Sequence, residues 1–183
     1  IYTGEDTLSL HDALPISGDC SVILGGSYGN DRGGHGALVW AGYGSGVSQI
    51  RQFILRDTTS DATPTVLTSN GSSVQKYFPY LPTRWAYHCR IRVIATDTST
   101  GTACKSFSGS CLIRRWTSDG GPYTVIVGSP SIASDFGDAA LSTASVSVSA
   151  DTILGGLLVT VTGVAATNLQ WAAHVEILEA RSQ

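Results

Sequence analysis

The 183-residue sequence contains no methionine, only four cysteines and few charged residues, which make up 14% of the chain. No apolar run approaches the length of a membrane-spanning helix, which argues against membrane insertion. None of the cysteines forms a C-x-x-C pair, and no histidine or second cysteine stands at the spacing of zinc ligands. Because Cys104 and Cys111 are seven residues apart, one continuous strand would place them on opposite faces. We expect no metal or cofactor site, and free, mostly buried thiols at Cys20, Cys89, Cys104 and Cys111.

The opening segment, residues 1–17, does not read as a native structural element. A proline would stop any helix in it after roughly two turns, and residues 1–16 contain no lysine or arginine for a secretory signal. The string "TLSLHDALPI" at residues 7–16 matches one reading frame of a common short-read sequencing adapter, residue for residue. Residues 1–16 therefore resemble translated adapter, and we do not interpret the adjacent His11 and Asp12 as a catalytic pair.

Excluding this segment changes the charge and the expected extent of the protein. It removes three acidic residues, so that eleven acids face eleven bases and the formal net charge rises from −3 to zero. A neutral chain favours neither a nucleic-acid partner nor a membrane surface. Because the sequence lacks methionine, we expect it to be the C-terminal fragment of a longer metagenomic gene that begins upstream of Gly18.

Residues 18–48 are rich in glycine and contain a weak internal repeat. The string "SVILGG" at residues 21–26 recurs as "ALVWAG" at residues 37–42, a shift of 16 residues that aligns Ile23 with Val39. A short apolar strand, a glycine corner and a polar turn are what stacked β-coils require. The pattern predicts a short Gly-rich β-coil repeat in this part of the chain.

Residues 49–183 read as short strands separated by turn signals, with no convincing amphipathic helix. In "TRWAYHCRIRVIAT" the apolar side chains alternate with polar ones, and "LQWAAHVEILEA" near the end of the chain does the same. Asn70-Gly71 lies between two apolar runs and is a hairpin signal. The sequence therefore predicts an all-β fold, with an antiparallel β-sandwich or jelly-roll-like domain over residues 49–183.

No group of residues stands out as a catalytic site. Asp135 and Asp138 could flank a sugar as paired carboxylates do, but a turn explains "SDFGD" more simply. His88 and His174 lie on polar strand faces, and neither is accompanied by a nucleophile motif. We interpret that polar face as cross-strand ion pairing of Arg90 or Arg92 with Glu176, and as a possible surface between subunits. We predict no catalytic residues and a non-enzymatic chain.

With these segments in place, the chain resembles bacteriophage tail-fibre and related virion structural proteins. "SVILGGSYGNDRGGHGALVWAGYGSG" is similar to the Gly-rich coils of fibre shafts and YadA-type adhesin heads, although "DRGGH" departs from their usual small-residue turn. The strands from "TRWAYHCRIRVIATDT" to "LQWAAHVEILEA" are similar to a β-domain at fibre ends. The resemblance implies a homotrimer in the virion that attaches to a host-surface glycan or protein. Trp40 is a candidate for the trimer interior, or else an ordinary residue buried within one chain.

Two other functions fit the same pattern. The first is a bacterial trimeric surface adhesin, whose head should be followed by a membrane anchor, whereas this sequence ends at Gln183 soon after its last predicted strand. The second is the non-catalytic C-terminal domain of a phage depolymerase. Of the three, we expect the phage attachment module.

Overall fold

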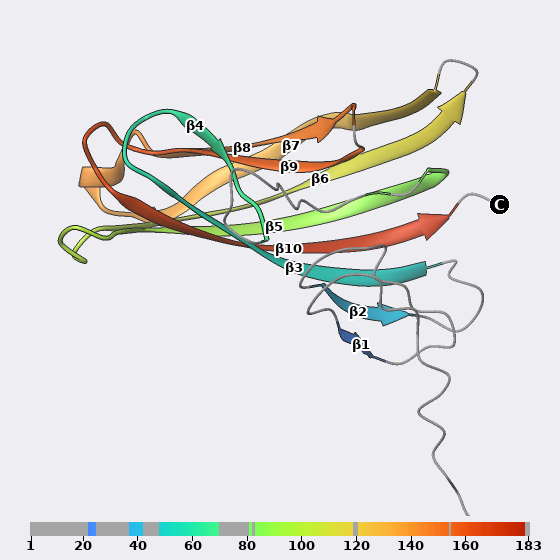
Figure 1. The fold of residues 1–183 in the computed structure, drawn as a ribbon, viewed down its shortest axis with the longest axis horizontal. Coiled ribbons are helices and arrows are strands. Elements are labelled where there is room, and N and C mark those ends of the chain that lie inside the picture. Colours follow the sequence, from blue (N-terminus) through green and yellow to red (C-terminus); the bar gives the residue numbers. More distant parts are fainter. Residues whose placement is uncertain are drawn as a thin grey trace, which may run out of the picture.

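The structure, a computed structural model, describes only part of the chain: residues 22–24, 37–41, 48–69, 81, 83–118, 121–153 and 155–181. Within this part the fold is all-β, as predicted, and strands form two sheets (Figure 1). One sheet has seven strands and the other has three. The one helical element among the described residues is a 3-10 turn, η1, at Ala139–Leu141.

The strands of the large sheet stand in the order β1-β2-β3-β10-β5-β6-β7. Their bounds are β1 Val22–Leu24, β2 Leu38–Ala41, β3 Ser48–Thr59, β5 Trp85–Asp97, β6 Cys104–Ser118, β7 Gly121–Gly137 and β10 Leu169–Arg181. The small sheet has the order β4-β9-β8, with β4 Pro64–Val66, β8 Ser145–Asp151 and β9 Gly156–Thr162. Figure 1 shows the small sheet on the side of β5 to β7, whereas β1 and β2 form the opposite edge of the large sheet.

The predicted alternation of side chains is confirmed in the long strands. Every second residue of β5 is buried, from Trp85 to Asp97, and the residues between them are exposed. In β10, which lies between β3 and β5, the apolar residues from Trp171 to Ile177 face the same interior. Cys104 is exposed and Cys111 is buried, so the two cysteines of β6 lie on opposite faces as their spacing predicts.

The strands of the two copies of the glycine-rich repeat, β1 and β2, are neighbours in the large sheet. β1 and β2 are parallel and pair Ile23 with Val39, the same offset of 16 residues that aligns the two strings. β2 then pairs antiparallel with β3, where Val39 faces Arg51, so both copies share a sheet with the strands that follow. The YadA-type coil and a domain boundary at residue 48 stay predictions. The adapter-like residues 1–17 and the hairpin at Asn70-Gly71 lie outside the described residues.

Apolar side chains from both sheets form one core. Trp171 of β10 is fully buried, its ring lies 6.2 Å from that of Phe107, and its Nε1 donates to Thr59 Oγ1 at 2.9 Å. The small sheet contributes Leu157 and Val159, which are also fully buried. Burial of each large apolar side chain contributes about 1.5–3 kcal/mol, so contact between the sheets is a main source of stability.

Lys105, on the inner face of β6, is the first of two buried cations that bind the small sheet. Its Nζ donates to three backbone carbonyls, of Leu141 at 2.9 Å, Ser142 at 3.0 Å and Ala144 at 2.9 Å. These carbonyls belong to η1 and to the turn that leads into β8. The ammonium group therefore binds backbone acceptors at the end of the short helical turn, where Leu141 O also accepts from the N–H of Ala144.

Arg115 is the second buried cation, near the other end of β6. Its Nη1 donates to the carbonyls of Leu81 and Gly155, the latter at 2.9 Å. Leu81 also donates from its backbone N–H to Gly155 O at 3.0 Å, immediately before β9 begins. Gly155 has φ +77°, and a Cβ placed there would lie 1.9 Å from the guanidinium carbon of Arg115. The guanidinium can bind at this point only because residue 155 has no side chain.

A buried ion pair joins β3 and β10. The Nε of Arg51 donates to Glu179 Oε1, both side chains are fully buried, and Gln49 Nε2 donates to Glu179 Oε2 at 3.2 Å. The guanidinium of Arg51 also lies 5.3 Å from the centroid of the Phe53 ring. Loss of one partner would leave a buried charge uncompensated, which typically costs about 3–5 kcal/mol.

Replacement of Gly155 by alanine should destabilise the fold more than the same change at Gly101. Both glycines have positive φ, so each substitution carries a backbone cost of about 1–2 kcal/mol. At Gly155 the new methyl group must also displace the Arg115 guanidinium from its carbonyl partners, which adds about 1–3 kcal/mol. Nothing lies within 4 Å of a Cβ at Gly101, so G101A is the matched control. Denaturant unfolding of both variants measures the difference, and equal losses would contradict the role of Arg115.

Candidate functional site

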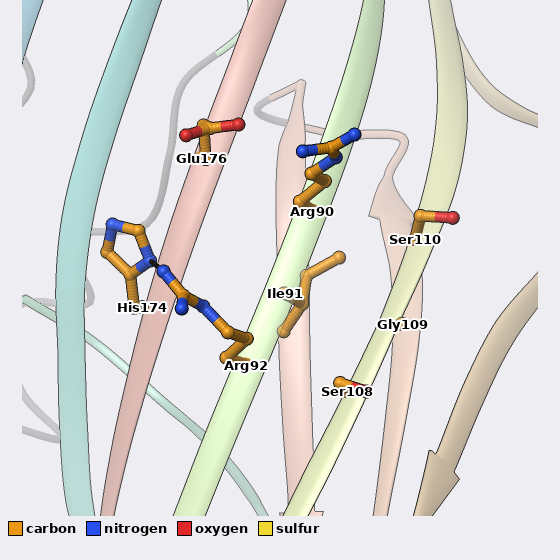
Figure 2. A pocket seen from close by; sticks show the side chains of 8 residues that line it. All are labelled: Arg90, Ile91, Arg92, Ser108, Gly109, Ser110, His174 and Glu176. Atoms are coloured by element: carbon orange, nitrogen blue, oxygen red, sulfur yellow. Dashed lines mark hydrogen bonds between the residues drawn. The ribbon is translucent and has the colours of Figure 1, made fainter.

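A hollow of about 390 Å³ lies on the outer face of the large sheet, on the side away from the core. Its walls come from β5, β6 and β10 (Figure 2). The residues that line it are Arg90, Ile91, Arg92, Ser108, Gly109, Ser110, His174 and Glu176.

The strand register brings the polar side chains of the hollow into two rows. In the first row Glu176 of β10 lies opposite Arg90 of β5, which lies opposite Ser110 of β6. The second row, displaced by two residues along each strand, contains His174, Arg92 and Ser108. Because residues two apart share one face of a strand, both rows face outward. Figure 2 shows Arg90 and Arg92 on β5 between the other two strands.

The hydrogen bonds of the hollow differ from the predicted ion pair. Arg92 Nη2 lies 3.0 Å from Nδ1 of His174, as the dashed line in Figure 2 marks. Glu176 Oε2 instead accepts from Gln52 Nε2 of β3 at 3.2 Å, and no ion pair joins it to Arg90 or Arg92 within the described residues. The expectation of such an ion pair is wrong: Gln52 and Arg90 both lie opposite Glu176, but its carboxylate accepts from Gln52, and Arg92 contacts His174.

The contact with Arg92 fixes the protonation of His174. A guanidinium can only donate, so Nδ1 of the imidazole must accept and the proton of the neutral ring is on Nε2. Partial burial lowers the pKa of His174 below its ordinary value of 6.5, and the charge of Arg92 lowers it further, whereas Glu176 opposes the shift. His174 is therefore a neutral group at pH 7, and the positive charge of the hollow comes from Arg90 and Arg92.

A second, more apolar hollow of about 370 Å³ adjoins the first and shares Arg92 and His174 with it. Ile54 and Ile94 line this hollow and are 58% and 51% exposed, which is unusual for isoleucine. Ala172 lies opposite Ile94 in the register of β10 and β5. The outer face therefore presents charged and hydroxyl groups beside apolar surface.

A mostly apolar row of side chains also crosses the outer face, from β2 at one side to β7 at the other. The row runs through the paired positions Trp40, Ile50, Leu178, His88, Leu112 and Val127. Trp40 is 39% exposed and Leu178 is 49% exposed, so a single chain does not bury them fully. His88 belongs to this row and does not line the polar hollow.

The two aspartates that could flank a sugar have separate structural contacts. Asp135 Oδ1 accepts from the Ser108 hydroxyl at 2.8 Å, at the border of the polar hollow. Asp138 Oδ2 accepts from the backbone N–H of Cys104 at 2.8 Å and precedes η1, which agrees with the interpretation as turn chemistry. For Asp135 that interpretation is wrong, because the residue lies within β7. His11 and Asp12 lie outside the described residues. The described part of the chain contains no cluster of three or more potential metal ligands, and none of its helices could cross a membrane.

Sequence reasoning identified the strand residues of β5 and β10 in the hollow but missed those of β6. Ser108, Gly109 and Ser110 lie in "SFSGSC", where small residues leave room between the strands. The feature of the sequence that could have predicted these residues is the run of small residues in the middle of a strand whose apolar residues alternate with polar ones. A Cβ at Gly109 would lie 1.8 Å from the carbonyl oxygen of Ser131 on β7, so glycine is required there for the two strands to approach.

Comparison with known proteins gives distant structural likenesses. No protein-family model matches the chain, and neither does any curated protein. A tailspike protein of the Acinetobacter baumannii bacteriophage Fri1, a capsular polysaccharide depolymerase, is similar over 75% of this chain, with 14% identity and a TM-score of 0.40. The tailspike protein of Acinetobacter baumannii phage AM24 matches 68% of the chain with 8% identity and a TM-score of 0.37.

The tailspike protein of Acinetobacter phage vB_ApiP_P1 is a third such structure, with 15% identity over 73% of this chain and a TM-score of 0.29. The chain covers only 18%, 26% and 22% of these three proteins, respectively.

Substitution of Arg92 by glutamine should raise the pKa of His174 without fully restoring its ordinary value. The change removes a nearby positive charge, but the partial burial that contributes most to the shift remains. Between the folded pKa and 6.5 the unfolded chain binds more protons, so His174 reduces stability as the pH falls through this window. NMR titration of the imidazole measures the effect.

The control for that titration is Arg114→Gln, which removes an arginine of β6 on the far side of the apolar row. It should leave the pKa of His174 unchanged. An Arg92→Gln variant whose His174 titrates at the same pH as in the unaltered protein would contradict the contact.

Proposed function

We propose that the chain is a non-enzymatic attachment module of a phage tail fibre or tailspike, which binds a glycan on the host surface. The observation that carries the proposal is the polar hollow on the outer face, with Arg90 and Arg92 beside two serine hydroxyls and a carboxylate. The sequence resemblance to tail-fibre proteins supports the same assignment. On this proposal the protein is part of the virion.

The groups of the hollow match the chemistry of a saccharide. Sugar hydroxyls both donate and accept hydrogen bonds, and Ser108, Ser110 and Glu176 offer both kinds of partner. Arg90 adds N–H donors that suit a carboxylate or another anionic substituent of the glycan. Of the two arginines, Arg90 should contribute more to glycan binding, because Arg92 already contacts His174.

The adjoining apolar hollow fits the remaining surface of a sugar ring. The C–H faces of a pyranose are apolar, and Ile54 and Ile94 provide exposed apolar surface next to the charged groups. Both hollows are on an open face of rigid strands, which a long polysaccharide could cross without threading into the protein. A polymer would therefore contact both hollows at once.

The contacts of the polar side chains support a binding role in place of catalysis. The Ser108 hydroxyl donates to Asp135, so its proton is not directed at the imidazole of His174. The Nδ1 of that imidazole accepts from Arg92 and is not available as a general base. A nucleophile within reach of a free base is what hydrolysis by acyl transfer needs.

The homotrimer belongs to the same proposal. The apolar row from Trp40 to Val127 leaves large side chains exposed across the outer face, from β2 to β7. Contact with further copies of the chain would remove this surface from water, and Trp40 is the largest side chain of the row. Packing around a threefold axis is the arrangement that tail-fibre resemblance implies.

Substitution of Arg90 by glutamine should weaken binding to acidic glycans by about tenfold or more, because hydrogen bonds to charged groups contribute about 1.5–3 kcal/mol. The probe is an array of acidic and neutral bacterial surface polysaccharides, on which the unaltered protein identifies the bound class. Arg114→Gln removes the same charge elsewhere on this face and is the matched control. Equal binding by both variants would contradict the assignment of the hollow.

Incubation with the bound polysaccharide tests the absence of catalysis. Chromatography of the glycan after incubation with residues 18–183 should show no shorter fragments. Release of fragments by this chain would overturn the non-enzymatic assignment and leave the binding site in place.

The purified protein should form a trimer of 19.1-kDa chains, which light scattering measures directly. Trp40→Ser should shift the distribution towards monomer, because it removes the largest exposed apolar group of the row. Ile153→Ser is a suitable control, since Ile153 is also a large exposed apolar residue but lies between β8 and β9. A monomeric mass for the unaltered protein at high concentration would contradict the trimer.

A further inference from the structure

Cys89 of β5 and Cys111 of β6 are direct partners across two antiparallel strands. Both side chains face the interior of the large sheet, and both thiols are free in the structure. Nothing in the proposed function uses them. They lie in the middle of the sheet, where the paired ladder of β5 and β6 extends in both directions.

The strand geometry places the two cysteines within reach of a disulfide bond. Directly opposed residues of antiparallel strands have Cα atoms about 4.5–5.5 Å apart, and disulfides span Cα separations of about 4.4–6.8 Å. The side chains of Cys89 and Cys111 lie directly opposite each other and are both buried on the inner face. Little movement of the backbone is therefore needed to join the sulfur atoms.

The two thiols differ in reactivity. Interaction between the two thiols lowers the pKa of Cys111 and, together with burial, raises the pKa of Cys89. Cys111 is therefore the thiol that ionises first and attacks as the nucleophile. Cys89 is fully buried, whereas Cys111 keeps 5% exposure, so the more nucleophilic sulfur is also the more accessible one.

An irregularity in the sheet lies next to Cys111. The pairing of β6 with β7 shifts between Ser110 and Leu112, so Cys111 has no partner on β7. Gly128 of β7, near this shift, has positive φ. The hydrogen-bond ladder between β6 and β7 is therefore interrupted at Cys111. Local opening of β7 at this point would give a small reagent access to the Cys111 thiol without unfolding of β5.

We propose that Cys89 and Cys111 form a cross-strand disulfide in the folded chain on contact with a low-molecular-weight disulfide. The thiolate of Cys111 attacks one sulfur of the reagent, and its S–S bond breaks to release the first reagent thiolate. The sulfur of Cys89 then attacks Cys111 Sγ and releases the second, and the protons of the two cysteines end on the two reagent thiols. The cysteine pair loses two electrons and the reagent gains them.

This bond would lock β5 to β6 beneath the polar hollow, whose arginines and serines stand on the same two strands. A chain made with free thiols in a reducing compartment would acquire the bond in an oxidising one. The inference does not depend on the identity of the receptor, because it rests on the register and the surroundings of the two cysteines.

The test uses the full chain with the substitutions Cys20→Ser and Cys104→Ser, which leave the proposed pair as the only cysteines. After incubation of the folded protein with oxidised glutathione, thiols are titrated in denaturant and the intact mass is measured. We expect loss of both thiols, a mass lower by two hydrogens, and a peptide that joins residues 89 and 111. The control adds Cys89→Ser and should give a stable mixed disulfide of Cys111 with glutathione.

Two results would overturn the proposal: retention of both thiols, or mixed and intermolecular disulfides in place of the internal bond. The melting temperature provides a second readout, and it should rise by about 5 °C or more on oxidation if the native geometry accepts the bond. A fall would show that the link distorts the sheet and would equally overturn the proposal. If the double variant does not fold, peptide mapping of the unaltered chain distinguishes the 89–111 link from any bond to Cys104 or Cys20.

Discussion

The attachment of the small sheet to β6 by two buried cations is the constraint on which the rest of the structure depends. Lys105 binds the carbonyls of η1 and the turn into β8, and Arg115 binds the carbonyls of Leu81 and Gly155 before β9. Both ends of the small sheet are thereby held over the inner face, so the apolar residues of β5, β6 and β10 find a partner layer. Each cation also donates to more than one buried backbone carbonyl, which compensates for burial of its charge.

Closure of one face leaves the other face free for binding. The outer face of the large sheet has three zones: the polar hollow around Arg90, the apolar hollow beside Ile54, and the apolar row that contains Trp40. Because all three stand on paired strands, their relative positions are fixed by the register and not by loop conformation. A rigid face of this kind suits attachment to a repeating polymer, whereas the apolar row suits contact with further copies of the chain.

Sequence alone predicted the all-β fold and the faces of β5 and β10, because strict alternation is a local property of each strand. It did not predict the hydrogen-bond partners of the charged residues, since side chains of two neighbouring strands lie opposite each of them. Glu176 lies between Gln52 and Arg90, and its carboxylate accepts from Gln52 where Arg90 or Arg92 was expected. The inward positions of the buried cations and of the Arg51–Glu179 pair had a local signal, because each stands in step with apolar neighbours on an inward face. The backbone carbonyls that Lys105 and Arg115 bind had no recognisable motif, because they come from distant parts of the chain.

Hydrogen exchange of Lys105→Met and Arg115→Met, compared with the unaltered protein, tests the role of the two cations most directly. We expect Lys105→Met to accelerate exchange of the backbone amides in β8, and Arg115→Met to accelerate exchange at the start of β9. Amides of β5 and β10 should keep their protection in both variants, because their ladder does not involve either cation. Unchanged exchange in the small sheet, or equal acceleration throughout both sheets, would contradict the claim that these two side chains hold the small sheet in place.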